Sequence, residues 1–162
     1  MKIYHIKQVQ FLPASLDQAW SFFADPGNLN EITPPGLQFS IQFISRKEQI
    51  YPGQLIGYRI RILPLIWVTW LTEITAVKAG EYFIDDQRNG PYALWHHQHH
   101  FREVPGGVEI TDEVNYAIPL GWLGQIVHRL FVGPQLQRIF AYRRRILNER
   151  FRMENTQEII TV

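Results

Sequence analysis

A succession of strand-like runs between residues 37 and 119 limits the folds that are open to this chain. Turn signals separate the runs about every 8 to 12 residues, which is the spacing of consecutive β-hairpins. Consecutive hairpins form an antiparallel sheet with short connections between neighbouring strands. We expect strands at 39–45, 54–63, 65–77, 82–87, 93–104 and 108–118.

The segments on either side of these runs add a strand and several helices. Alternation over residues 3–11 predicts one more strand, which brings the expected sheet to seven strands. Ser15 is a suitable N-cap for an amphipathic helix at 16–24, and Pro and Gly residues delimit a second short helix at 27–32. Residues 121–153 are typical of a long amphipathic helix, in which Gly133-Pro134 predicts a kink or break. We expect one domain over residues 1–153 and a tail over 154–162.

The composition excludes several classes of protein. Hydrophobic residues make up 46% of the chain, including 10 Phe, 7 Tyr and 5 Trp, which indicates a packed domain and not a disordered one. The net charge of +1 gives no field that would attract a nucleic acid. The absence of cysteine excludes disulfides and thiolate metal sites. No signal-peptide pattern and no run of roughly 20 apolar residues is found, so we expect a cytoplasmic protein without a membrane span.

A set of short motifs resembles a known superfamily. The motifs are Phe-Ile-Asp-Asp-Gln at 83–87, Gly-Pro at 90–91, Trp-His-His-Gln-His-His-Phe at 95–101, Asp-Glu-Val-Asn-Tyr at 112–116 and Phe-Ala-Tyr-Arg at 140–143. In this order they resemble the START/polyketide-cyclase (SRPBCC) superfamily, and in particular a bacterial ligand-binding subgroup. The resemblance extends over nearly the whole chain, to about Phe151.

The resemblance implies a fold and a place for a ligand. The implied fold is the helix-grip fold of the α+β class, a curved seven-stranded antiparallel sheet wrapped round a long C-terminal helix, with two short helices after the first strand. Members of the superfamily bind lipids, sterols, polyketides and plant hormones in a cavity between sheet and helix, and some are aromatase/cyclases. The subgroup itself supplies no assigned substrate.

The histidine-rich run pairs with the strand that follows it. If Pro105-Gly106 is a two-residue loop, Val104 lies opposite Gly107 and His99 lies opposite Asp112. Because strand side chains alternate between the two faces, one face then collects a single set of residues. That set is Trp95, His97, His99, Phe101, Ile110, Asp112, Val114 and Tyr116. The opposite face is polar enough for water, so we expect this set on the concave face.

The favoured function is the binding of a hydrophobic or amphipathic small molecule that is lipid-, sterol- or polyketide-like. A polar cluster on an apolar wall is typical of a site that orients a ligand, and a drug-sized ligand needs a cavity of at least about 300 Å³. The expected ligand-binding residues are Trp95, His97, His99, Phe101, Asp112, Val114, Tyr116, Tyr58, Trp70, Phe131 and Phe140.

Other interpretations of the cluster remain open. His99 and Asp112 can form a structural pair that satisfies two buried polar groups. In an enzyme such as a cyclase or dehydratase, His97 or His99 would act as general acid or base, oriented by Asp112, with Tyr116 as a hydrogen-bond donor. The two histidines and the facing acid can also supply a metal triad, but we favour hydrogen bonding and expect neither a metal nor a cofactor. A cell-division-related interaction protein is a further alternative.

Arginines gather towards the end of the last helix. The simplest interpretation is a solvated face that complements the negative end of the helix dipole, and weak contact with an anionic membrane surface is the alternative. Arg143 differs because it lies on the apolar stripe, where its charge needs a partner. The candidate partners are Asp85, Asp86 and Glu73.

Overall fold

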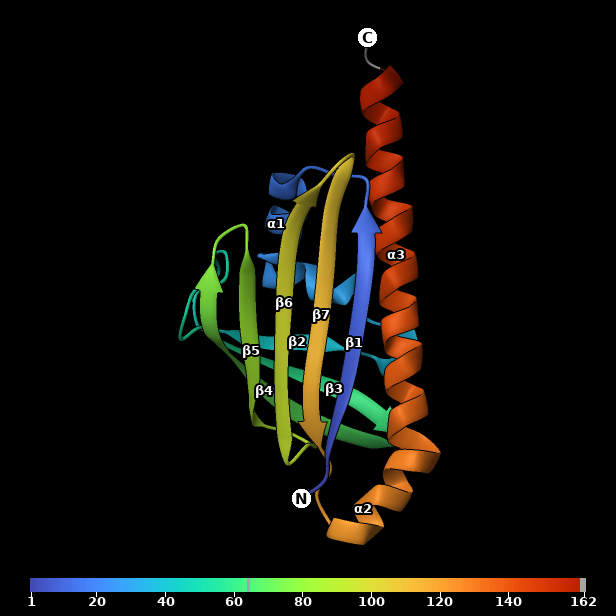
Figure 1. Cartoon of the computed structure of the whole chain (residues 1–162). Coiled ribbons are helices and arrows are strands. Elements are labelled where there is room, and N and C mark those ends of the chain that lie inside the picture. Colours follow the sequence, from blue (N-terminus) through green and yellow to red (C-terminus); the bar gives the residue numbers. More distant parts are fainter. Residues whose placement is uncertain (64, 161–162) are drawn as a thin grey trace.

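A curved antiparallel sheet and one long helix make up most of the molecule (Figure 1). The computed structural model describes residues 1–63 and 65–160. The sheet has seven strands in the order β1-β7-β6-β5-β4-β3-β2, and all neighbouring pairs are antiparallel. The strands are β1 (Ile3–Leu12), β2 (Ser40–Ile44), β3 (Leu55–Leu63), β4 (Ile66–Lys78), β5 (Tyr82–Asn89), β6 (Leu94–Val104) and β7 (Gly107–Ala117). The expected strands are therefore confirmed, with ends that differ by a few residues.

Short helices connect the first two strands. These are α1 (Leu16–Phe23) and the 3₁₀ turns η1 (Pro26–Asn30) and η2 (Pro35–Leu37). Ser15 is the N-cap of α1, because its hydroxyl accepts from the Gln18 N–H at 3.2 Å while the Gln18 side chain accepts from the Ser15 N–H at 2.9 Å. Both short helices that the sequence predicts are thus present, although the second is a 3₁₀ turn.

The C-terminal helical region consists of α2 (Gly121–Val127), the π-helical turn η3 (His128–Val132) and α3 (Gly133–Ile160). The Gly133 N–H donates to the His128 carbonyl, five residues earlier, directly before Pro134. Proline has no N–H and crowds the preceding turn, so the wider π turn accommodates it. The irregularity expected at Gly133-Pro134 is found here. The helix continues to Ile160 and does not end near residue 153, since no Gly or Pro follows to stop it.

Two hydrogen-bonded contacts fix α3 across the sheet. The Gln10 amide of β1 donates to the Arg144 carbonyl at 2.9 Å and to the Asn148 side chain at 3.0 Å. Near the start of the helix, the Gln135 amide donates to the Ile62 carbonyl of β3 at 2.9 Å. Because β1 and β3 lie on different sides of the curved sheet, α3 spans the concave face between them (Figure 1).

The interior contains two apolar clusters. One packs α1 and the end of α3 against the sheet and includes Phe22, Phe83, Phe101, Leu147 and Phe151. The other lies under the first part of α3 and includes Trp70, Trp95, Val114, Tyr116 and Phe140. Along β6 the order is Trp95, His97, His99 and Phe101, so the two histidines lie between the clusters.

One surface of the helical region is unusually apolar. Apolar side chains of α2 and η3 that the amphipathic pattern predicts to be buried are exposed instead, for example Leu123 at 49% and Leu130 at 61%, and Trp122 beside them is 69% exposed. In the described part of the chain, none of the helices has both the length and the apolar character that crossing a membrane requires.

Candidate functional site

The site begins with the β6–β7 hairpin, whose register is as predicted. Val104 lies opposite Gly107, His99 opposite Asp112 and Trp95 opposite Tyr116. Gly106 has a φ of 82°, a left-handed conformation that a residue without a Cβ adopts at little cost, and this allows the tight two-residue turn. The side chains of His97, His99 and Asp112 are buried at 4 to 6% exposure on the concave face.

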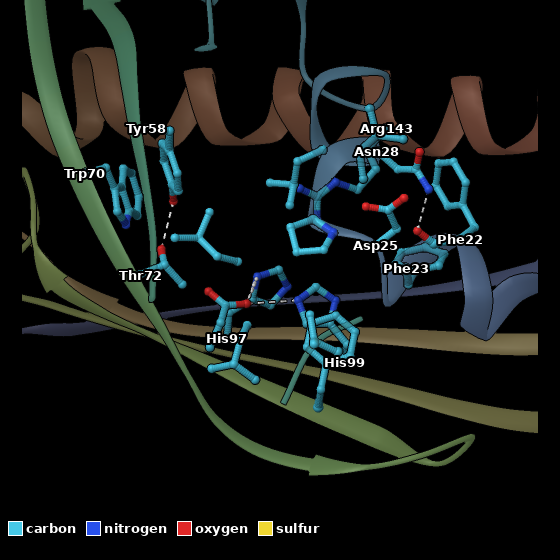
Figure 2. Close-up of a pocket in the computed structure, with 18 of the residues that line it drawn as sticks. Phe22, Phe23, Asp25, Asn28, Tyr58, Trp70, Thr72, His97, His99 and Arg143 are labelled. Carbon is cyan, nitrogen blue, oxygen red and sulfur yellow. Dashed lines mark hydrogen bonds and ion pairs between the residues drawn. The ribbon is translucent and has the colours of Figure 1, made fainter. Parts of the chain in front are cut away.

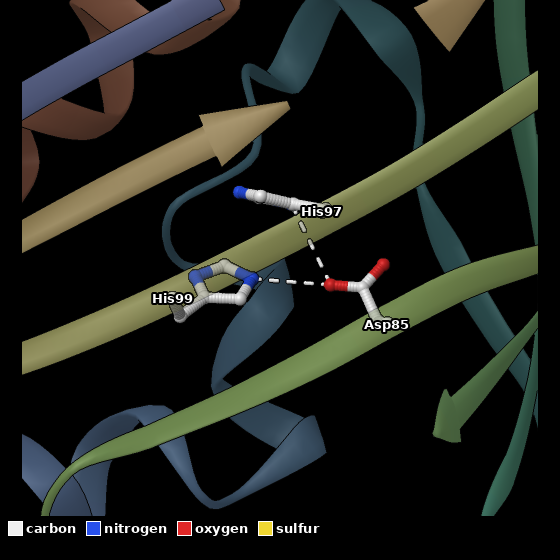
Figure 3. A group of neighbouring side chains, drawn as sticks. All are labelled: Asp85, His97 and His99. Carbon is white, nitrogen blue, oxygen red and sulfur yellow. Dashed lines mark hydrogen bonds and ion pairs between the residues drawn. The ribbon is translucent and has the colours of Figure 1, made fainter. Parts of the chain in front are cut away.

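A second carboxylate from β5 completes the cluster. Asp85 lies opposite His97, and its Oδ2 is 3.1 Å from His99 Nε2 and 3.5 Å from His97 Nδ1 (Figure 3). Asp112 Oδ1 lies 3.2 Å from His97 Nε2 and 2.7 Å from His99 Nδ1. Acids and imidazoles therefore alternate in a closed set of four, which we call the Asp–His ring. All four imidazole nitrogens face a carboxylate oxygen.

The contacts of the ring differ in quality. His99 Nε2 with Asp85 and His97 Nε2 with Asp112 have hydrogen-bonding geometry. His99 Nδ1 is closest to Asp112, at 2.7 Å, but it makes no hydrogen bond because the contact is poorly aligned. That contact is an ion pair by distance and contributes through charge alone.

The electrostatics of the ring favour unequal protonation of the two imidazoles. Burial disfavours the charged form of His99, but Asp112 and Asp85 outweigh it and raise its pKa. Burial and the neighbouring His99 lower the pKa of His97. Burial would raise the pKa of Asp112, yet the two histidines hold it well below its usual range, and that of Asp85 is lowered likewise. The ring therefore combines two carboxylates with one imidazole that favours its charged form.

A cavity of about 120 Å³ adjoins the ring between the sheet, the α1–η1 segment and α3 (Figure 2). Its aromatic walls come from Phe22, Phe23, Tyr58, Trp70, Phe83 and Trp95, and its polar walls from Asp25, Asn28, Thr72, Asp85, His97, His99 and Arg143. Tyr58 donates or accepts one hydrogen bond with Thr72, at 3.0 Å.

The prediction that the cavity between sheet and helix has a volume of at least about 300 Å³ is wrong. Aromatic side chains fill the half of the interior under the first part of α3. Trp70 and Trp95 rings pack edge to face at 5.2 Å, and Tyr92 lies 4.8 Å from Trp95. The remaining space, about 120 Å³, lies at the Asp–His ring.

The predicted site residues fall into three groups. The cavity wall contains Tyr58, Trp70, Trp95, His97 and His99. Buried behind that wall are Phe101, Asp112, Val114 and Phe140. Of these, Asp112 touches both histidines, and the Phe140 ring lies 6.0 Å from that of His97.

Two predicted residues lie away from the cavity. The Tyr116 hydroxyl is 2.8 Å from His128 Nε2 of η3, so it is already engaged at the far end of β7. Phe131 is 52% exposed. The π turn explains this second error, because one extra residue per turn rotates the apolar stripe away from the sheet.

Sequence reasoning missed the wall formed by α1 and η1, which includes Phe22, Phe23 and Asn28. No local pattern shows which end of the sheet these helices cover. The sequence did contain a signal that Asp85 belongs to the site, because Asp85 lies in the motif at 83–87 and shares a strand face with Phe83.

Arg143 lines the cavity, as Figure 2 shows, and its Nε is buried. Of its candidate partners, Asp86 contacts His96 and Thr75 on the other face of the sheet, and Glu73 pairs with Arg88. Asp85 is near enough for Arg143 to lower its pKa. Yet no hydrogen bond or ion pair joins Arg143 to the side chains of residues 1–62 and 65–152, and its guanidinium lies 5.5 Å from the Phe140 ring.

Solved structures share this arrangement of sheet and helix. The aromatase/cyclase Zhui from a Streptomyces species has a TM-score of 0.73 at 12% identity, over 93% of this chain and 94% of that one. This chain has the helix-grip fold. Norcoclaurine synthase from Thalictrum flavum shares the helix-grip fold with a TM-score of 0.63 at 15% identity, over 92% of this chain and 97% of its own. Major latex-like protein 151 from Panax ginseng has a TM-score of 0.67 at 12% identity, with the same coverage.

The helix-grip fold that the START/polyketide-cyclase resemblance implies is therefore confirmed. At identities of 12 to 15% these neighbours establish the fold, not the ligand. No model of a protein family matches the sequence. No curated protein matches it significantly either.

Proposed function

We propose that this helix-grip domain binds one small amphipathic molecule that carries an acidic group. Arg143 supports the proposal most directly, because its guanidinium enters an aromatic cavity without an ion-pair partner among the residues described. Arg143 is partly buried, and a charge that is withdrawn from water without a partner is costly, so a carboxylate on a ligand would supply the partner that the described residues do not.

The size of the cavity limits which ligands can bind. A cavity of about 150 Å³ in another protein holds one benzene molecule. The space here, about 120 Å³, accordingly suits a single ring or a short chain with a polar end. Tyr58, Trp70 and Trp95 offer an apolar surface to that ring, and Arg143 faces its acidic end. A sterol or a long lipid chain does not fit this volume.

Calorimetry with short aryl carboxylates tests the proposal. Phenylacetate and 3-phenylpropanoate should bind the wild-type chain more tightly than the corresponding amides, because only the carboxylates form an ion pair with Arg143 in addition to hydrogen bonds. Arg143→Met keeps the apolar stem and removes the charge, and it should weaken acid binding by about 10- to 100-fold, the equivalent of about 1.5 to 3 kcal/mol.

Arg144→Met is the matched control, because Arg144 is the next residue on α3 and is exposed. It should leave the affinity within about twofold of wild type, since exposed charges contribute little. Equal binding of acids and amides, or wild-type affinity in Arg143→Met, would contradict the proposal. Native mass spectrometry of freshly purified protein is an independent route, because a retained ligand reports its own mass.

A second candidate is a cyclase or dehydratase, which the His99–Asp85 pair at the cavity wall favours. An imidazole held by a carboxylate can transfer protons to and from a bound substrate. One structural neighbour is an aromatase/cyclase. Turnover of small polyketide-like substrates should then be lost in folded His97→Ala and His99→Ala variants. Binding of such compounds without conversion by the wild-type chain would contradict this candidate.

A further inference from the structure

The two histidines of the Asp–His ring each contact one carboxylate at the cavity wall and one behind it. One nitrogen of each imidazole, His97 Nδ1 and His99 Nε2, faces Asp85 at the cavity wall. The other nitrogen of each faces Asp112, which is 3% exposed and lies behind the wall. We propose that Asp85, His97 and His99 bind a divalent transition-metal ion of the Zn²⁺ and Co²⁺ class, and that Asp112 positions the two histidines.

The three ligand atoms are close enough to share one ion. Asp85 Oδ2, His97 Nδ1 and His99 Nε2 all lie within 4.8 Å of one another. The oxygen is 3.5 Å from the first nitrogen and 3.1 Å from the second. Ligand atoms that are each about 2.1 Å from a tetrahedral Zn²⁺ lie about 3.4 Å apart. The two distances from Asp85 Oδ2, 3.5 and 3.1 Å, lie on either side of this value.

Asp112 has the place of an outer carboxylate in a metal site. A histidine that ligates a metal donates its other ring N–H to a carboxylate, which fixes the tautomer and the ring orientation. Asp112 Oδ1 is 3.2 Å from His97 Nε2, with hydrogen-bonding geometry, and 2.7 Å from His99 Nδ1, where a change of alignment would be needed for a hydrogen bond. In the metal-bound state, protons on these two nitrogens would leave the nitrogens that face Asp85 free to ligate the ion, and the proton that His99 Nε2 shares with Asp85 in the metal-free chain would be released. A simple structural ion pair would need only one histidine beside Asp112, whereas here one carboxylate contacts both of the proposed histidine ligands.

The charge of the ring also fits a divalent cation. Metal ligation requires both imidazoles to be neutral, and in that state the two carboxylates give the ring a net charge of −2, which a divalent ion neutralises. The two-histidine, one-carboxylate set suits transition metals and not Ca²⁺ or Mg²⁺, which prefer oxygen ligands.

The proposed ion would be open to the cavity. Asp85, His97 and His99 all line the cavity, as Arg143 does, so we expect the remaining coordination positions to face this space. Three protein ligands with an open position are the arrangement of metal sites that bind water or a small molecule. The proposal concerns the site of the proposed function but does not depend on it, because metal binding can be measured without any organic ligand.

Titration of chelator-treated, untagged chain with Co²⁺ tests the metal site. We expect visible absorption that saturates at one equivalent, displacement of Co²⁺ by Zn²⁺, and a rise in the unfolding temperature with metal concentration. Asp112→Asn should weaken Co²⁺ binding by about 10- to 100-fold. Asp85→Asn, which removes a direct ligand, should weaken it at least as much.

Asp86→Asn is the matched control. Asp86 is the next residue of β5, and it pairs with His96 of β6 on the opposite face of the same two strands, at 2.7 Å. It should leave Co²⁺ affinity unchanged. Absence of saturable absorption in the wild-type chain, or the same loss in Asp86→Asn as in Asp85→Asn, would overturn the proposal. If Asp85→Asn does not fold, the wild-type stoichiometry and the absorption spectrum still decide it.

The metal and ligand proposals fail separately. Aryl carboxylates that bind the metal-free chain through Arg143 would support the proposed function even if Co²⁺ does not bind. One equivalent of bound Co²⁺ without any carboxylate binding would support the metal site alone.

Discussion

Replacing Asp112 with alanine should lower the free energy of unfolding by about 3 to 5 kcal/mol, the usual result of removing one partner from a buried charged pair. Asp112 faces both His97 and His99, and all three side chains are at most 6% exposed. Its loss leaves His97 Nε2 without its hydrogen-bond acceptor and removes the carboxylate that lies 2.7 Å from His99 Nδ1. Urea unfolding followed by circular dichroism measures the change.

The control for Asp112 lies one residue further along the same strand. Glu113 is 28% exposed and pairs with His5 and Lys7 on the other face of the sheet. Glu113→Ala should change stability by less than about 1 kcal/mol, because exposed ion pairs contribute little. If the Asp112 variant loses no more stability than the Glu113 variant, the ring does not contribute to the fold as we describe.

Phe151→Ala should be about as damaging, with a loss of about 3 to 5 kcal/mol. The Phe151 side chain is 2% exposed, and its ring packs edge to face against Phe22 of α1 at 5.7 Å. The substitution leaves a cavity where the end of α3 joins α1 to the sheet. Thermal and urea unfolding should agree on the size of the loss.

Trp122→Ala serves as the comparison for Phe151. Both are large aromatic residues of the C-terminal helical region, but Trp122 of α2 is 69% exposed. Its removal should change stability by no more than about 0.5 kcal/mol. A large loss for Trp122→Ala, or a small one for Phe151→Ala, would show that the two parts of the helical region contribute differently from what their burial indicates.

Short-range signals predict the strands and the β6–β7 register. A two-residue turn leaves no freedom in pairing, so Gly106 and the alternation of both strands are sufficient to place His99 opposite Asp112. The β5–β6 connection is longer, which leaves the pairing of Asp85 with His97 open from sequence alone. The second carboxylate of the ring was therefore missed, although its motif was recognised.

The cavity and the outer helix face depend on long-range packing. The volume is set by how Trp70, Tyr92 and Trp95 fill the interior, and no periodicity predicts that. The apolar face that contains Phe131 was predicted from an α-helical period. The wider turn η3 breaks that period, so the side chains before it point in a different direction from those of α3. Both errors arise where a local pattern meets a constraint from distant parts of the chain.

The Asp–His ring has a consequence for engineering the stability of this domain. Well-packed apolar side chains in place of buried charged groups often leave a protein equally stable or more stable. A search for thermostable variants would therefore tend to select apolar replacements at Asp85, His97, His99 and Asp112, and so remove the chemistry of the site. Stabilising changes are better sought on the exposed surface of α2 and η3, where a gain in stability need not oppose function.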